Sequence, residues 1–307
     1  MEQKKKSVTR GQHFLSQCWL KGFTPFGTKE SQLVIFDFIR KKTFSTIPKN
    51  VAKERDFNQI EINGIDANYL ESQLAIFEDK ANAAICNIQQ TGKFEGDDRR
   101  VILDLMALFA LRNPFRREYW DNIRSHDAQI IFSIAAKNVG GTLNGIYIPP
   151  EFKEVGDAEI RVEMHKNEHI HLELSCIDTV IQCLVKRNWT LVHAEKDLTF
   201  IASDRPVILS WKDDKQYVAD PGFASPRSQV VFPLTKKLAL VGDFEERECV
   251  ITASRRLMAS INSLILSNTA LQIYSETGDF IFLKHTGELA YGSEELWKYR
   301  GSLVAAE

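Results

Sequence analysis

The chain has 307 residues, of which 44% are hydrophobic and 26% are charged, and its formal net charge is −2. This composition is typical of a globular protein with a sizeable hydrophobic core. The near-neutral charge disfavours a dedicated, sequence-blind nucleic-acid binder, because such proteins are usually strongly basic. A local basic patch is still compatible with this charge.

The N-terminus reads MEQKKKSVTRGQHF, and no apolar segment of a secretory signal follows its basic residues. No run of 18 or more apolar residues occurs, so we expect no membrane-spanning segment and no membrane partner. The five cysteines are widely spaced and form no CxxC motif. We therefore expect reduced thiols and a cytoplasmic location.

The predicted elements begin with a hairpin segment at residues 1–65. In QLVIFDF, residues 32–38, the side chains alternate in the manner of a strand. RKKT at 40–43 is a plausible turn, and TFSTI at 43–47 is predicted to be the return strand. The stretch NVAKERDFNQI at 50–60 predicts a short helix capped by Asn50.

Residues 66–140 are predicted to be helical. Apolar residues at three-and-four spacing predict a first helix over 66–91, with Asp66 as its N-cap and Gly92 as its stop. A second helix begins near 97–98 and is apolar nearly all round, so we expect it at the centre of the core. Pro114 should end it around Arg112, and a third helix should follow until Gly140.

Residues 141–307 are predicted to mix short strands with helices. We expect a strand at 160–164, then a strand at 170–174 that gives way to a helix near Ser175. A further amphipathic helix is predicted at 252–270. Strands are predicted within 189–194, 198–203, 206–211, 229–234, 238–242, 273–275 and 279–285. The order favours a single α+β domain over 1–307, with the helical middle packed on a mixed or antiparallel C-terminal sheet.

Several common catalytic motifs are missing from the chain. It contains no GxxxxGK[ST], no GxGxxG and no GxSxG. The sequence therefore disfavours P-loop NTPases, kinases, Rossmann enzymes and α/β-hydrolases.

His169 and His171 would share one face of the predicted strand and could together bind a metal ion. The opposite face carries Ile170, Leu172 and Leu174, so the two histidines also fit an ordinary solvated face. We favour the solvated face.

Two further places carry polar residues next to buried elements. Arg112, Arg116 and Arg117 form a cationic cluster after the central helix, and guanidinium groups suit phosphate or carboxylate ligands. Internal ion pairs are the alternative. Asp204 lies at the end of an apolar strand, where a rigid sheet positions binding carboxylates, although it also fits a turn that bonds its own backbone.

Several short segments make the chain resemble DUF4238, a bacterial family of unknown function. In chain order they are HFLSQCWLKGF (13–23), NVAKERDF (50–57), LESQLAIFEDKANAAI (70–85), LRNPFRR (111–117), WTLVHA (189–194), FIASDRPV (200–207), VFPLT (231–235) and INSLILSNTALQIYS (261–275). The resemblance implies that certain polar residues belong to the family pattern, namely His13, Glu54, Asp56, Arg112 and Asp204. It supplies no reaction.

The chain departs from the family pattern beside these polar residues rather than at them. Ser16 replaces a proline, Lys21 replaces an arginine, Asn58 replaces a tyrosine, and Arg205 stands where asparagine is common. Gln17 follows the pattern. No specific role is weakened by these departures.

The leading functional hypothesis is a hydrolase that acts on nucleic acid or nucleotide with the help of a divalent cation. His13 would be the general base, Asp204 with Glu54 or Asp56 would hold the cation, and Arg112 would steady the phosphate. We also assign substrate binding to two further residues, Arg116 and Gln17. This hypothesis requires the side chains to converge.

The alternative is a non-enzymatic ligand-binding, sensing or interaction module, including one in a bacterial defence or toxin system. The same polar residues would then form a ligand pocket or a network that only fixes the fold.

Overall fold

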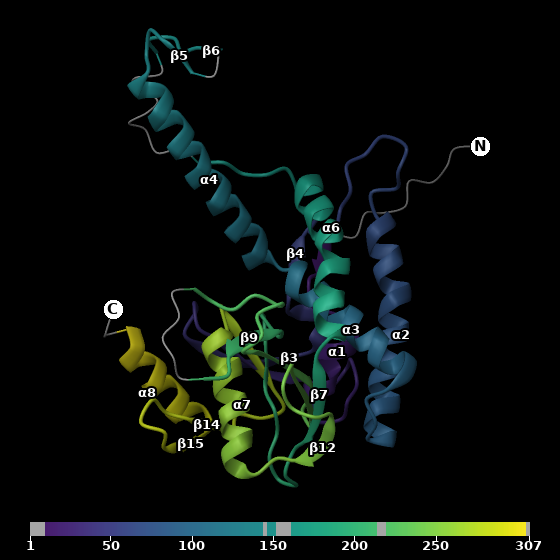
Figure 1. Cartoon of the computed structure of the whole chain (residues 1–307). Coiled ribbons are helices and arrows are strands. Elements are labelled where there is room, and N and C mark those ends of the chain that lie inside the picture. The colour runs from purple at the N-terminus through teal and green to yellow at the C-terminus, as the bar shows by residue number, and fades with distance from the viewer. Residues whose placement is uncertain (1–9, 144–145, 152–160, 214–218, 305–307) are drawn as a thin grey trace, which may run out of the picture.

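A mixed sheet, an antiparallel sheet and a group of long helices make up the α+β fold (Figure 1). The computed structural model describes residues 10–143, 146–151, 161–213 and 219–304. The helical middle and the C-terminal sheets predicted from the sequence are both present.

The predicted N-terminal hairpin is confirmed as β2 (Leu33–Asp37) and β3 (Lys42–Thr46), which pair antiparallel. On its other edge, β2 pairs with β13 (Gln272–Ser275), and β13 pairs with β8 (Ala202–Ser203). The N-terminal segment is therefore built into one four-stranded sheet with C-terminal strands.

The larger sheet has five strands and lies in the C-terminal half. Only the β12–β7 pair is parallel, and the other neighbours are antiparallel. Its order is β12 (Cys249–Thr252), β7 (Asn188–His193), β11 (Leu238–Asp243), β10 (Ser228–Thr235) and β9 (Ile208–Trp211).

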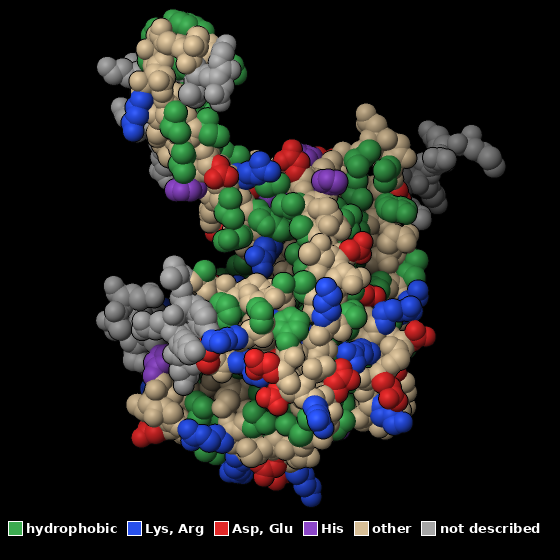
Figure 2. Space-filling model, viewed as in Figure 1, with side chains coloured by type: hydrophobic (Ala, Val, Ile, Leu, Met, Phe, Trp, Pro, Cys, Tyr) green, Lys and Arg blue, Asp and Glu red, His purple; other side chains and the backbone are tan. Residues whose placement is uncertain are grey.

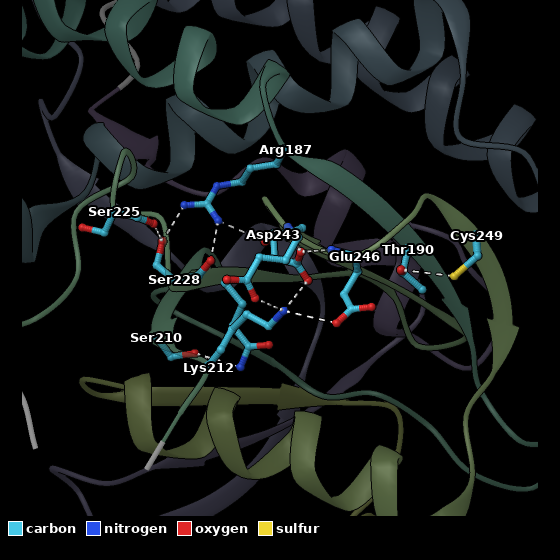
Figure 3. A network of polar contacts seen from close by, with 12 residues as sticks. Arg187, Thr190, Ser210, Lys212, Ser225, Ser228, Asp243, Glu246 and Cys249 are labelled. Atoms are coloured by element: carbon cyan, nitrogen blue, oxygen red, sulfur yellow. Dashed lines mark hydrogen bonds and ion pairs between the residues drawn. The ribbon is translucent and has the colours of Figure 1, made fainter. Parts of the chain in front are cut away.

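Arg187 braces one end of this sheet (Figure 3). Its guanidinium is buried and donates hydrogen bonds to the carbonyl oxygens of Ser228, Gly242 and Phe223. It also lies over the ring of Phe244, 4.3 Å from the centroid. These contacts join the end of a helix to the start of β10, the end of β11 and the 220–223 loop, so we assign this network to the fold.

Three two-stranded pairs complete the described strands. They are β1 (Gly11–His13) with β4 (Lys53–Arg55), β5 (Thr142–Leu143) with β6 (Ile146–Tyr147), and β14 (Ile281–Leu283) with β15 (Leu289–Tyr291). The β1–β4 pair places His13 opposite Lys53 and Gln12 opposite Glu54.

The main helices predicted from the sequence occur in the predicted order, whereas the first and last helices of the structure were not predicted. The described helices are α1 (Gln17–Leu20), α2 (Tyr69–Thr91), α3 (Gly96–Leu111), α4 (Pro114–Lys137), α6 (Lys166–Val185), α7 (Arg255–Asn268) and α8 (Gly292–Val304), with short 3-10 turns η1 (Lys21–Phe23) and η2 (Pro48–Asn50). Gly92 ends α2 in a left-handed conformation, with φ of 65°, as glycine does without a Cβ penalty. The break before Pro114 is confirmed.

The central position predicted for α3 is also confirmed. Its side chains join the larger hydrophobic cluster, in which Trp19 packs edge-on against Phe109 and stacked against Phe232. The indole of Trp19 donates a hydrogen bond to the Pro233 carbonyl. The N-terminal motif thus ties α3 to the five-stranded sheet.

The distal half of α4 projects from the body of the protein and carries β5 and β6 near its far end (Figure 1). Hydrophobic side chains lie on the surface of this projection (Figure 2). Ile123, Ile130, Ile131 and Ile134 are all exposed. No helix in the described ranges is both long and apolar enough to cross a membrane.

Three local predictions were wrong. Residues 161–164 form no regular structure, and residue 160 lies outside the described residues. The predicted strand at 170–174 is part of α6, because its alternation also satisfies helical spacing. The stretch after Asn50 contains the strand β4 instead of a helix. Ala52 before the strand and Asp56 after it both have left-handed backbone conformations.

Candidate functional site

Arg112 is a buried structural centre. It is 5% exposed, and its guanidinium donates hydrogen bonds to the carbonyl of His13 at 2.9 Å and to the side-chain oxygen of Asn58 at 2.9 Å. A third bond of 3.3 Å reaches the carbonyl of Phe14. Asn58 in turn donates to Glu71 on α2. Three sequence motifs therefore meet at this arginine. Both terminal nitrogens of its guanidinium donate to acceptors of the protein itself.

The His13 side chain lies at the edge of this network, between β1 and η2. Its Nδ1 is buried and has no hydrogen-bond partner among the described residues. Burial lowers the pKa of His13 to about 4, helped by the nearby charge of Lys53 and opposed by the backbone of Val51 and Ala52. The imidazole is therefore neutral at physiological pH.

Both carboxylate oxygens of Asp204 accept hydrogen bonds from backbone amides. Asp204 is 2% exposed, and the donors are the amides of Ala270, Leu271 and Gln272 at 2.6 to 3.0 Å. Burial raises the pKa of this carboxyl, and the three amides oppose that shift. The carboxylate caps the turn between α7 and β13.

The predicted arginine cluster divides into three environments. Arg117 makes a two-point ion pair with Glu173 of α6, at 2.6 and 3.1 Å, and also donates to the Phe57 carbonyl. Arg112 belongs to the buried network described above. Arg116 points to another recess, where it lies over the ring of Tyr119.

The remaining predicted residues lie apart from these groups. Gln17 begins α1 and is half-buried. Asp56 has a left-handed backbone and forms an ion pair with Arg55 at 3.4 Å. Among the predicted residues, the Arg112 side chain contacts the backbone of His13, and Glu54 and Asp204 line one cavity, but the full set does not converge on one point.

A cavity of about 1010 Å³ forms an open cleft beside this network. It lies between α4, the β2–β3 hairpin, β4 and the 161–163 segment. Its charged and aromatic lining includes Phe14, Glu54, Arg117, Glu118, Asp121, His169, Asp204 and Tyr274. We refer to it as the α4 cleft.

Glu54 is the predicted catalytic residue whose carboxylate is exposed in the α4 cleft. No hydrogen bond or ion pair engages it within the part of the chain that the structure describes. Partial burial in the cleft raises the pKa of Glu54, and the charge of Arg117 opposes the shift. A carboxyl with a raised pKa in a cleft is a candidate for ligand binding or acid–base chemistry.

His169 was not selected from the sequence. In the helix α6, His169 and His171 lie about 200° apart around the axis, so they do not share a face. His169 packs inward, with Nε2 3.2 Å from Asp121 and its ring stacked on Trp120. The helical spacing of α6 was the signal that could have identified it.

The carboxylates expected to hold a divalent cation do not form a ligand set. Asp56 pairs with Arg55, and although Glu54 and Asp204 both line the cleft, the carboxylate oxygens of Asp204 are occupied by backbone amides. Among the described residues, no group of three or more His, Cys, Asp and Glu side chains is placed to hold a metal ion. We therefore derive no step through a metal.

Comparison with known proteins identifies a family. The model of DUF4238, described as a protein of unknown function, matches residues 11–279 of the chain. No curated protein and no solved structure matches it.

Proposed function

Because the chain belongs to the DUF4238 family, whose description assigns no activity, we propose a function from the geometry of the α4 cleft. The protein is a ligand-binding or sensing module, and its ligand is a small polar molecule that contacts Glu54. We keep the cytoplasm as its expected location, since all five cysteines are free thiols.

One observation carries this proposal: segments far apart in the family pattern line the same cleft. Phe14 comes from the first motif, Glu54 from the second, Arg117 from the fourth, and Asp204 and Tyr274 from later ones. A packed core alone would not require these segments to border an open space of this volume. Concave sites with a few convergent polar groups are typical of small-ligand binding.

The walls of the cleft are already held by internal pairs. Arg117 pairs with Glu173, and Asp121 contacts His169 and accepts a hydrogen bond from the Met164 amide. Such pairs fix the side chains before a ligand arrives, which lowers the entropy cost of binding.

Two carboxylates in the lining are available to a ligand. Within the described part of the chain, neither Glu54 nor Glu118 has an ion pair or side-chain hydrogen bond. Both are acceptors when ionised. They favour a ligand that presents a cationic or hydrogen-bond donor group to this part of the cleft.

The hydrolase hypothesis remains a second proposal, and the position of Glu54 favours it. A carboxyl with a raised pKa in a cleft can act as a general acid or base. In this version Glu54 carries the chemistry without a bound metal, and His13, Arg112 and Asp204 support the fold. The substrate class stays as expected from the sequence, a nucleic acid or a nucleotide.

A paired screen tests both versions. Wild-type protein and Glu54→Gln would be melted with a panel of amines, amino acids and nucleotides, and then incubated with labelled DNA, RNA and nucleotides. Glu30→Gln, on an exposed loop outside the cleft, is the matched control. A ligand that stabilises wild type and Glu30→Gln but not Glu54→Gln supports binding, and turnover lost only in Glu54→Gln supports the hydrolase.

A further inference from the structure

A second recess, of about 630 Å³, lies at the start of α4, and Glu54 is not part of its lining. Its walls come from the end of α3, the first turns of α4, the segment leading into β9, the 220–223 loop and the end of α7. Phe115 lines both this recess and the α4 cleft. We call it the arginine recess.

Two guanidinium groups line the arginine recess without an acidic partner. In the described residues, neither Arg116 nor Arg205 forms an ion pair, whereas Arg117 and Arg99 are both paired with carboxylates. Burial lowers the pKa of Arg116, and the nearby charge of Arg205 lowers it further. Two like charges held close together in a partly desolvated site repel each other unless an anion lies between them.

The surrounding contacts orient the side chain of Arg116 and fix the backbone of Arg205. The Arg116 guanidinium lies 5.6 Å from the centre of the Tyr119 ring, a cation–π arrangement that orients its planar face. The Asn268 amide donates a 2.7 Å hydrogen bond to the Arg205 carbonyl, which fixes the backbone of that residue to the end of α7. The Arg116 side chain and the Arg205 backbone are therefore positioned before any ligand binds, while the Arg205 side chain is exposed.

We propose that the arginine recess binds an oxyanion, a phosphate or a carboxylate group, between Arg116 and Arg205. Guanidinium groups bind such anions through parallel N–H donors, with geometry that matches their oxygens. Asp220 also lines the recess, and because its like charge repels an anion, the proposal places the anion between the two arginines. The site does not depend on the function proposed for the α4 cleft.

Isothermal titration with inorganic phosphate and with succinate, at constant ionic strength, tests this site. We expect saturable binding of one or both anions by the wild type, and at least a tenfold loss of affinity in Arg116→Gln and in Arg205→Gln, about 1.4 kcal/mol each. Binding of phosphate alone identifies a phosphate site, and binding of succinate alone identifies a carboxylate site.

Arg100→Gln is the matched control, because it removes one positive charge from the other end of α3, where Arg100 pairs with Asp97 on the surface. Its affinity should equal that of the wild type. Arg205 is exposed, so Arg205→Gln keeps the test valid even if the half-buried Arg116 is needed for folding. The proposal is overturned if neither anion binds saturably, or if Arg205→Gln binds as tightly as the wild type.

Discussion

The guanidinium of Arg112 donates a 2.9 Å hydrogen bond to the backbone carbonyl of His13, 99 residues away in the chain. This hydrogen bond involves the main chain of His13 and not its imidazole. A buried arginine with three acceptors fixes the course of the N-terminal segment against the end of α3. The contact with Arg112 therefore fixes the backbone position of His13.

Arg112→Lys should strongly destabilise the protein. Lysine cannot present the planar set of donors that reaches three acceptors, so buried carbonyls lose their partners, at a cost of about 2–4 kcal/mol. Urea unfolding at pH 7 measures this loss. Arg100→Lys, on the surface of the preceding helix α3, should change stability by less than about 0.5 kcal/mol. Equal stability of the two variants would contradict the structural role of Arg112.

Because of His13, we expect the free energy of unfolding to fall in mild acid. The pKa of His13 is about 4 in the folded protein and about 6.5 in the unfolded chain, so the unfolded chain takes up the proton first as the pH falls. Stability is therefore lost between pH 6.5 and 4, by about 2 kcal/mol between pH 7 and pH 5.

The comparison of wild type with His13→Leu isolates this contribution, because all other titrating groups are common to both. Urea unfolding at pH 7 and pH 5 should show a smaller loss in the variant, by about 2 kcal/mol. An identical loss in both proteins would show that the folded environment does not depress the pKa of His13.

Asp204→Asn separates a structural role from a catalytic one. The carboxylate accepts three backbone N–H groups, and an amide in its place turns N–H donors toward N–H donors. We expect a loss of about 2 kcal/mol in unfolding free energy, against less than about 0.5 kcal/mol for the exposed Asp79→Asn. Unchanged stability with lost ligand binding or turnover would instead place Asp204 in the functional machinery.

The pH dependence of the α4 cleft depends on which role Glu54 has. An ionised Glu54 that binds a cationic ligand loses affinity as the pH falls through its raised pKa, which lies above the ordinary value of 4.5. A general acid does the opposite, since its activity is lost as the pH rises through the same pKa. Binding titrations and rates measured from pH 4 to pH 8 distinguish the two, and neither profile should survive in Glu54→Gln.

The sequence predicted those helix ends that depend on the backbone preferences of single residues. Gly92 ends α2 because glycine adopts the left-handed conformation without a Cβ penalty, and Pro114 separates α3 from α4 because its ring fixes φ and removes an N–H donor. The segment at 170–174 failed because its apolar residues satisfy both periodicities, and packing against α3 decides in favour of a helix. The β1–β4 pair and the β2–β13 pair join distant segments, which periodicity alone does not specify.

The candidate site was predicted in part. The sequence selected Glu54, which faces the cleft, and Arg116, which lines the arginine recess. It could not show that the Arg112 and Asp204 side chains are occupied by backbone groups, because such bonds depend on tertiary proximity. Nor did it indicate Arg205 as the neighbour of Arg116, since the two residues are far apart in the chain.

The central claim is that the α4 cleft binds the ligand through Glu54, while the Arg112 network supports the fold. Thermal melts of wild type and Glu54→Gln, with and without the ligands found in the screen, test this claim most directly. The account predicts equal melting temperatures without ligand, because Glu54 is exposed and unpaired in the described structure, and a ligand-induced rise in the wild type alone. An equal rise in both proteins would contradict the role of Glu54 and place the functional site elsewhere.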